Sequence, residues 1–258
     1  MTGMDILLTN DDGIDSTGLR VLHDALAEVG DVLVVAPADD QSAIGRAIST
    51  EVRVEERDLG YALSGTPADC VVAGLEAIGP YPDLVVAGCN NGANLGAYTL
   101  GRSGTVSAAV EAAFFRVPAI ATSLYVPTER WPAEPDPGSF EHAARATTYL
   151  ADHALGAGVF EQADYLNVNA PGVADAPAPM AITRPSHTYD MDATREDNGT
   201  ITLHDRVFDR MDDGALEEPE GTDRRAVMEG KVSVSPLTAP HTTERHEALD
   251  ALAETYSP

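Results

Sequence analysis

The sequence predicts an α/β fold, a Rossmann-like, doubly wound and mostly parallel sheet with an extended arm in the C-terminal half. Apolar segments rich in Val, Ile and Leu alternate with helix-like segments along the first 124 residues, and such segments are typical of buried parallel strands. This alternation favours right-handed βαβ units with helices on both faces of one sheet. Residues 174–230 are polar, rich in Asp and weakly patterned, so we expect the arm there.

The individual elements follow from apolar spacing and from turn and capping residues. Strands are expected at 5–9, 32–36, 84–87, 119–124, 165–169 and 231–235, with a weaker hairpin at 51–64. Helices are expected at 16–29, 66–78, 103–113, 140–155 and 242–256. Thr66 and Ser103 stand where N-caps are expected, and Gly30 stands where the helix 16–29 should stop.

The chain carries far more acidic than basic residues. It has 42 Asp and Glu against 16 Lys and Arg, a net charge of −26, and Lys231 is its only lysine. At molar salt the Debye length is about 3 Å, which screens the repulsion among such charges. The composition therefore predicts a protein of a salt-rich cytoplasm, such as that of a halophilic archaeon; a merely acidic mesophile would not normally lack lysine. A nucleic-acid polymer is an unfavourable partner, because binding its phosphates needs a basic surface.

Membrane and secretory signals are absent from the sequence. No run of 18 apolar residues is present and the N-terminal segment has no basic region or cleavage site, so we expect no membrane contact and a cytoplasmic location. Cys70 and Cys89 are the only cysteines. Both stand among apolar residues and are expected to be small buried side chains in a reducing compartment.

Oxygen-bearing side chains follow three of the expected strands: Asp11 with Asp12, Ser42, and Asn90. Ligands of open α/β sheets bind beyond the carboxyl ends of the strands, so these side chains should converge. Two adjacent carboxylates are costly unless a cation compensates them. Each motif alone has a simpler interpretation, a solvated Asp-Gly turn or a loop serine, but their combination favours a metal site. Oxygen ligands without His or Cys favour Mg²⁺ or Mn²⁺ over Zn²⁺.

A candidate anion site follows the third of these strands. Ser103-Gly104-Thr105 begins a helix, and the first N–H groups of a helix have no internal partners and attract phosphate oxygens. The glycine-rich stretch 88–96 permits close approach of the backbone, and Asn94 can donate an amide hydrogen bond. Tight packing of this helix on the sheet would also explain its small residues, and both interpretations can hold together.

Several motifs in the chain carry a family resemblance. They are Leu8-Thr-Asn-Asp-Asp-Gly13, Val35-Ala-Pro37 with Ser42, Gly65-Thr-Pro-Ala-Asp-Cys70, Gly88-Cys-Asn-Asn-Gly-Ala-Asn-Leu-Gly96, Ser103-Gly-Thr-Val-Ser-Ala-Ala109, Leu166-Asn-Val-Asn-Ala-Pro171, and Gly221-Thr-Asp223 with Gly230-Lys-Val-Ser233. Together they closely resemble the SurE family of survival-protein nucleotidases, from residue 4 to about 238. The resemblance implies one domain over 1–258, with the Rossmann-like core and active site in 1–125 and the remaining strands, arm and terminal helix in 126–258.

The same resemblance implies an activity and its residues. It implies a metal-dependent phosphatase that hydrolyses nucleoside 5′- and 3′-monophosphates, with one Mg²⁺ or Mn²⁺ per subunit. The metal ligands map onto Asp11, Asp12, Ser42 and Asn90, and the catalytic residues onto Asp11, Asp12, Asn94, Ser103, Gly104 and Thr105. Which carboxylate acts as the base stays open. Family members are dimers or tetramers, so the arm and terminal helix are expected to join subunits.

Three positions depart from the family pattern. Ala43 stands where glycine usually follows the metal-binding serine, Arg102 stands where a tyrosine usually precedes Ser-Gly-Thr, and Lys231 stands where an aromatic residue is usual. These departures concern the surroundings of the substrate and not the expected metal ligands.

Two other classes of protein share parts of this pattern. A haloacid-dehalogenase-type phosphatase would require Asp-x-Asp-Gly-Thr, and the spacing of Asp11-Asp12-Gly13 differs. A nucleotide-binding sensor would be expected to carry Gly-x-Gly-x-x-Gly after the first strand, where this chain has Asp11-Asp12-Gly13-Ile14-Asp15. Phosphate release from nucleotides distinguishes these classes.

Overall fold

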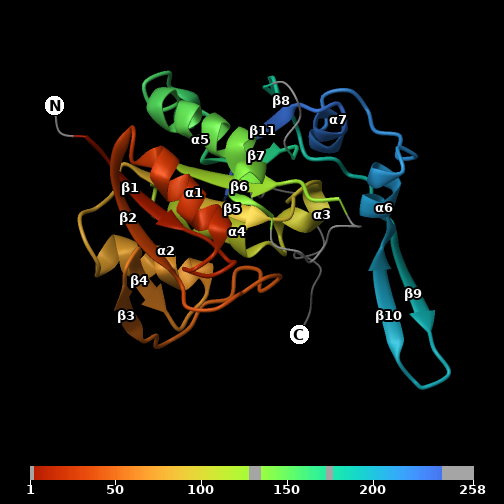
Figure 1. Cartoon of the computed structure of the whole chain (residues 1–258), viewed down its shortest axis with the longest axis horizontal. Helices are drawn as coiled ribbons and strands as arrows, with labels where there is room; N and C mark the ends of the chain where they lie inside the picture. Colours follow the sequence, from red (N-terminus) through yellow and green to blue (C-terminus); the bar gives the residue numbers. More distant parts are fainter. Residues whose placement is uncertain (1–2, 128–134, 173–176, 240–258) are drawn as a thin grey trace, which may run out of the picture.

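A nine-stranded sheet forms the centre of the computed structural model, which describes residues 3–127, 135–172 and 177–239 (Figure 1). Its strands lie in the order β3-β4-β2-β1-β5-β6-β7-β11-β8. They are β1 (Met4–Thr9), β2 (Gly30–Pro37), β3 (Val54–Arg57), β4 (Gly60–Leu63), β5 (Leu84–Asn91), β6 (Ala119–Leu124), β7 (Tyr165–Ala170), β8 (Met180–Ile182) and β11 (Val232–Leu237). The strands from β4 to β7 are parallel, whereas β3 and β11 run antiparallel to β4 and β7. The predicted mostly parallel α/β sheet is confirmed.

Helices cover both faces of this sheet. The α-helices are α1 (Thr17–Leu26), α2 (Pro67–Glu76), α3 (Ala97–Leu100), α4 (Gly104–Phe114), α5 (Glu141–His153), α6 (Arg206–Asp212) and α7 (Asp223–Met228), with short 3₁₀ turns η2 (Pro137–Phe140) and η3 (Val159–Glu161). Helices α1 and α5 pack together on one face, and α2 and α4 pack together on the other. Within the described part of the chain, no helix has the length and apolar character needed to cross a membrane.

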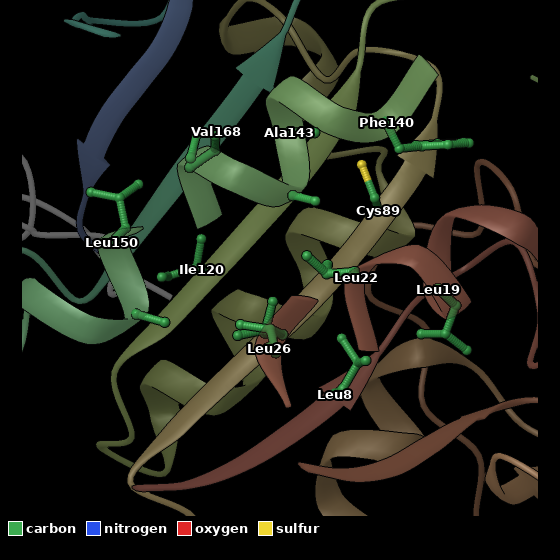
Figure 2. Close-up of a cluster of buried hydrophobic side chains, with 14 of the residues drawn as sticks. Leu8, Leu19, Leu22, Leu26, Cys89, Ile120, Phe140, Ala143, Leu150 and Val168 are labelled. Carbon is green, nitrogen blue, oxygen red and sulfur yellow. The ribbon is translucent and has the colours of Figure 1, made fainter. Parts of the chain in front are cut away.

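The face under α1 shows how the apolar spacing builds the core. Leu19, Leu22 and Leu26 recur at helical spacing and are fully buried. Figure 2 shows them beside Leu8 of β1, with Phe140 of η2 and the side chains of α5 completing the same cluster. The expected stop of this helix at Gly30 is wrong: α1 ends at Leu26, and Gly30 begins β2 by pairing with Met4 of β1.

The opposite face depends on two capped helices. The Thr66 side chain accepts the Asp69 N–H and the Asp69 carboxylate accepts the Thr66 N–H, a reciprocal capping box with Pro67 at the helix start. The Ser103 hydroxyl accepts the Val106 N–H at the start of α4. Both expected N-caps are therefore confirmed, and they fix where these helices begin relative to the strands.

Two features near the site differ from the expected boundaries. Strand β5 extends to Asn91, beyond the expected end at residue 87, and its pairing with β6 shifts between Ala87 and Asn90. The shift bends the end of the strand and changes the direction of its side chains, as a β-bulge does. The short helix α3 was not expected. It has only four residues, between Gly96 and Gly101, which are too few to show a helical pattern in the sequence.

The weakly patterned stretch contains an arm and also parts of the body. Strands β9 (Met191–Arg195) and β10 (Ile201–Asp205) form an antiparallel hairpin that projects from the body, with α6 at its base (Figure 1). Strand β8 joins the main sheet and α7 packs on β11, so the arm is shorter than the expected 174–230. The expected helix at 242–256 lies outside the described residues.

Candidate active site

A cavity of about 480 Å³ lies beyond the carboxyl ends of β1, β2 and β5. Residues from all three predicted strand ends line it together with two residues of the predicted anion site: Asp11, Ser42, Asn90, Asn94 and Ser103. The parallel strands present these ends at one edge of the sheet, which is why segments far apart in the sequence meet here.

Asp11 is the buried carboxylate of this cavity, with 3% of its surface exposed. Burial raises its pKa to about 6, against the opposing effect of hydrogen bonds from Thr105; the charge of Asp40 raises it further. The Thr105 hydroxyl donates to Asp11 Oδ1 at 2.5 Å. A Cβ on Gly104 would lie 2.7 Å from Asp11 Cβ, so the start of α4 reaches Asp11 because residue 104 is glycine.

The start of α4 therefore contacts Asp11 through Thr105 and also lines the cavity through Ser103. Thr105 was expected to face a phosphate, and the structure places it, fully buried, against Asp11. Ser103 lines the cavity, and its oxygen already accepts the Val106 N–H. A hydroxyl that accepts one hydrogen bond still has its proton to donate, so Ser103 retains a donor for an anion.

Asp12 lines an adjoining cavity of about 340 Å³, together with Asp40 and Asp15. Its Oδ2 accepts the Asn91 backbone N–H at 2.9 Å. Asn91 lines both cavities and marks their boundary. Asp11 and Asp12 thus line two different cavities, which share Asn91.

The loop after β2 holds Ser42 against the carboxylate of Asp40. The Ser42 N–H and hydroxyl donate to Asp40 Oδ1 at 2.8 and 2.6 Å, and the Gln41 N–H donates to the Asp11 carbonyl at 2.7 Å. Ala43 adopts φ +59°, a left-handed conformation that costs a non-glycine residue roughly 1–2 kcal/mol. The departure from glycine at this position thus leaves a strained residue next to Ser42.

Asn94 is fixed by side chains of the neighbouring strands. Its N–H donates to Asn169 Oδ1 at 2.7 Å, and its carbonyl accepts Asn167 Nδ2 at 2.9 Å and Asn169 Nδ2 at 3.2 Å. Its own Nδ2 donates to Ser123 Oγ at 2.9 Å. The Asn-Val-Asn motif of β7 therefore sets the position of Asn94, a role that the sequence alone did not reveal.

Several residues that line the cavity were not among the predicted site residues. Arg102 donates to the Tyr98 hydroxyl, and its guanidinium lies 5.0 Å from the centroid of the Tyr98 ring. It is the single basic residue among the described residues of the cavity wall. Met191 and Leu203 of the arm and Phe208 of α6 form an apolar side. No local signal marks these three as site residues, because the fold alone brings the arm to the cavity.

The donors suit a hard divalent cation. Carboxylate, hydroxyl and amide oxygens are the ligands that Mg²⁺ and Mn²⁺ prefer. Asp11, Ser42 and Asn90 line one cavity, and Asp12 lines the adjoining one. In the described part of the chain, no group of three or more His, Cys, Asp or Glu is arranged to hold a metal. The predicted ligand set contains only two carboxylates, and its other members are neutral oxygens.

A doubly wound sheet with an oxygen-lined cavity at its carboxyl edge, beside a helix start, defines a class of α/β proteins that bind phosphate-bearing ligands. Within that class the chain belongs to the SurE family, whose model, described as survival protein SurE, matches residues 6–192. The resemblance expected from the motifs is confirmed.

Similar proteins agree over nearly the whole chain. The chain is 66% identical to the 5′-nucleotidase SurE of Haloarcula marismortui over 257 residues, which cover 98% of this chain and 95% of the relative. It is 37% identical to the 5′-nucleotidase SurE of Methanosarcina mazei, covering 90% and 91%. The crystal structure of the SurE protein from Aquifex aeolicus superposes with a TM-score of 0.81 at 32% identity, covering 96% of this chain and 99% of that one.

Proposed function

We propose that the chain is a divalent-metal-dependent phosphomonoesterase that hydrolyses nucleoside 5′- and 3′-monophosphates to nucleoside and phosphate. The observation that carries the proposal is the meeting of Asp11, Ser42 and Asn90 with Asn94 and Ser103 in one cavity. The 66% identity to a 5′-nucleotidase SurE supports the same reaction.

Asp11, Asp12, Ser42 and Asn90 would hold one Mg²⁺ or Mn²⁺ per subunit. When bound, the ion supplies Lewis acidity and positive charge at a phosphate oxygen. The bonds from Gln41 to the Asp11 carbonyl and from Ser42 to Asp40 fix the loop that carries Ser42 before any ligand arrives.

The chain itself binds and orients the phosphate. Ser103 and Asn94 donate to phosphate oxygens, and Arg102 adds the positive charge that complements a dianion. These donors are fixed before substrate binds, so they stabilise charge on the equatorial oxygens at little reorganisation cost.

The reaction replaces one phosphorus–oxygen bond by another. Water attacks phosphorus, its proton passes to a carboxylate oxygen of Asp11 or Asp12, and the bond to the ribose oxygen breaks. The carboxylic acid then returns a proton, directly or through water, to the ribose oxygen, which leaves as the nucleoside hydroxyl. The apolar side made by Met191, Leu203 and Phe208 contacts the nucleoside.

The assembly and location follow the family. The hairpin of β9 and β10 would join subunits into a homodimer or homotetramer. The protein would act in the cytoplasm on small nucleotides, without a membrane or nucleic-acid polymer as partner.

Phosphate release from a panel of 5′- and 3′-nucleoside monophosphates, with Mn²⁺ or Mg²⁺ and with chelator, tests the proposal. We expect release that requires the metal and that is restored when metal is added back. Turnover through a trapped phosphoaspartate would instead indicate the dehalogenase-type mechanism. Binding of nucleotide without phosphate release would indicate a sensor.

A further inference from the structure

The deepest buried charges outside the site form a cluster at the start of α7. Asp223 and Arg224 are 0% and 1% exposed, and Glu218 lies beside them at 7%. Burying charge is costly unless hydrogen bonds satisfy it. The bonds that Asp223 and Arg224 make therefore indicate what the cluster holds in place.

Asp223 joins the glycine-rich loop to the segment that leads into the arm. Its Oδ2 accepts the Gly96 N–H at 2.7 Å, and its Oδ1 accepts the Ser186 N–H at 2.9 Å. Gly96 is two residues from Asn94, and Ser186 is five residues before β9. A single carboxylate thus spans two segments that are far apart in the sequence.

Arg224 makes the same connection through carbonyl groups. Its Nη2 donates to the Leu95 carbonyl at 3.2 Å and its Nη1 to the Thr188 carbonyl at 2.7 Å. Glu218 lies 3.6 Å from Nη1 and balances its charge. Gly96 adopts φ +82°, which strains any other residue, and a Cβ there would lie 2.4 Å from Nη2 and displace the guanidinium.

Each of the two connected segments is followed or preceded by a residue that lines the cavity. Asn94, next to Leu95, lines the wall that carries the proposed phosphate donors, and Met191, three residues after Thr188, lines the apolar wall. The separation of these walls determines whether a phosphate and its attached nucleoside fit at the same time.

We propose that Asp223 and Arg224 are positioning residues that fix the glycine-rich loop and the root of the arm relative to each other, and so set the separation of phosphate and nucleoside contacts. The kinetic part of this inference rests on the proposed function. Its structural part does not, because the hydrogen bonds exist without substrate.

A purely structural role for the pair is the alternative, and Arg224→Lys separates the two. Lysine keeps the charge beside Glu218, but its ammonium is a single point that cannot serve both the Leu95 and Thr188 carbonyls as the guanidinium does. Arg225→Lys is the matched control. Arg225 is the next residue, lies exposed and pairs with Glu229 at 2.5 Å, away from the loop.

The experiment measures Mn²⁺ affinity, kcat, KM and amide hydrogen exchange in molar KCl, well below the melting temperature of each variant. For Arg224→Lys we expect kcat to fall about tenfold or more, because misplacing reacting groups by about an ångström is costly. Mn²⁺ affinity should stay within about twofold, because Arg224 is not among the proposed ligands. Exchange should accelerate together in peptides that cover Asn94–Gly96 and Ser186–Thr188, and Arg225→Lys should match the wild type.

The inference is overturned if Arg224→Lys keeps wild-type kcat and exchange, or if its exchange rises uniformly over the whole sheet. A wild-type protein that releases no phosphate would refute the proposed function, while hydrogen exchange would still test the connection of loop and arm. If Arg224→Lys does not fold, Asp223→Asn replaces it, with faster exchange expected at the Gly96 and Ser186 amides.

Discussion

Asp12 presents a carboxylate to the cavity that adjoins the one lined by Asp11, with one oxygen accepting the Asn91 N–H. Asp12→Asn removes the charge and keeps the shape. If Asp11 and Asp12 together balance a divalent cation, Mn²⁺ binding should weaken and turnover should fall roughly a hundredfold or more. Calorimetric titration with Mn²⁺ and initial rates measure the two effects.

Asp15→Asn is the matched control for that variant. Asp15 lines the same cavity as Asp12, but its side chain is 76% exposed. It should change neither Mn²⁺ affinity nor rate appreciably. Near-normal affinity and rate in Asp12→Asn would remove Asp12 from the metal site.

Ser103 has two functions that one substitution would remove together. Ser103→Ala deletes the N-cap of α4, which costs about 1 kcal/mol, whereas glycine at an N-cap costs only a few tenths. Ser103→Gly therefore removes the hydroxyl while largely keeping the cap. Both variants should lower the rate by about a hundredfold with Mn²⁺ affinity close to wild type, since a lost anion donor acts on catalysis. A parallel loss of metal affinity would place Ser103 among the metal ligands instead.

Because Asp11 is buried, the loss of stability on metal removal should depend on pH. Its folded pKa of about 6 lies above the ordinary value of 3.8 expected in the unfolded chain, so its contribution to stability is complete below the lower value and is lost as pH rises through the higher one. A bound cation compensates the buried charge. The rise in melting temperature that Mn²⁺ produces over chelator should therefore be larger at about pH 7 than at about pH 5. An equal rise at both pH values would contradict the importance of the buried Asp11 charge.

At the scale of elements, local signals located the core strands and the longer helices but not the short elements or the residues of the arm that line the cavity. The apolar run at 119–124 coincides with β6, and Leu19, Leu22 and Leu26 identify the buried face of α1. These succeed because burial leaves a periodic pattern in the sequence. The Asp-rich stretch has no such pattern, since its hairpin lies mostly in solvent.

In the candidate site, too, some residues could be predicted from the sequence and others could not. Residues at strand ends could be predicted, because parallel strands share one edge of the sheet. Asn167 and Asn169 lie within β7 and hold Asn94 from a distance of more than seventy residues in the chain. Only the order of strands in the sheet makes them neighbours, and a single sequence does not contain that order.

The arm gives a prediction about assembly. An isolated two-stranded hairpin is marginally stable in water, yet Ile201 and Leu203 of β10 are 59% and 69% exposed. If the hairpin packs against another subunit, Ile201→Asp should lower the mass measured by light scattering in molar KCl. Thr194→Asp adds the same charge on the neighbouring strand β9, at a position that is already polar and exposed, and should keep the wild-type mass. Equal masses for all three proteins would argue against assembly through this face.

At the scale of the whole molecule, the net charge of −26 makes stability depend on salt. The Debye length is about 30 Å at 0.01 M salt and about 3 Å at 1 M, so repulsion across the surface is strong in dilute buffer and mostly screened at molar salt. Self-repulsion opposes both the compact state and the association of acidic subunits. Fold and oligomer should therefore both strengthen as KCl rises.

Thermal unfolding and sedimentation across a KCl series at fixed Mn²⁺ test this dependence. The melting temperature and the oligomeric fraction should rise together towards molar KCl. Asp11 is buried and held by Thr105 at 2.5 Å, so Mn²⁺ affinity should change less with salt than the fold does, because buried groups are screened less than surface charges. A melting temperature that stays flat or falls between dilute and molar KCl would show that the acidic surface is not an adaptation to salt.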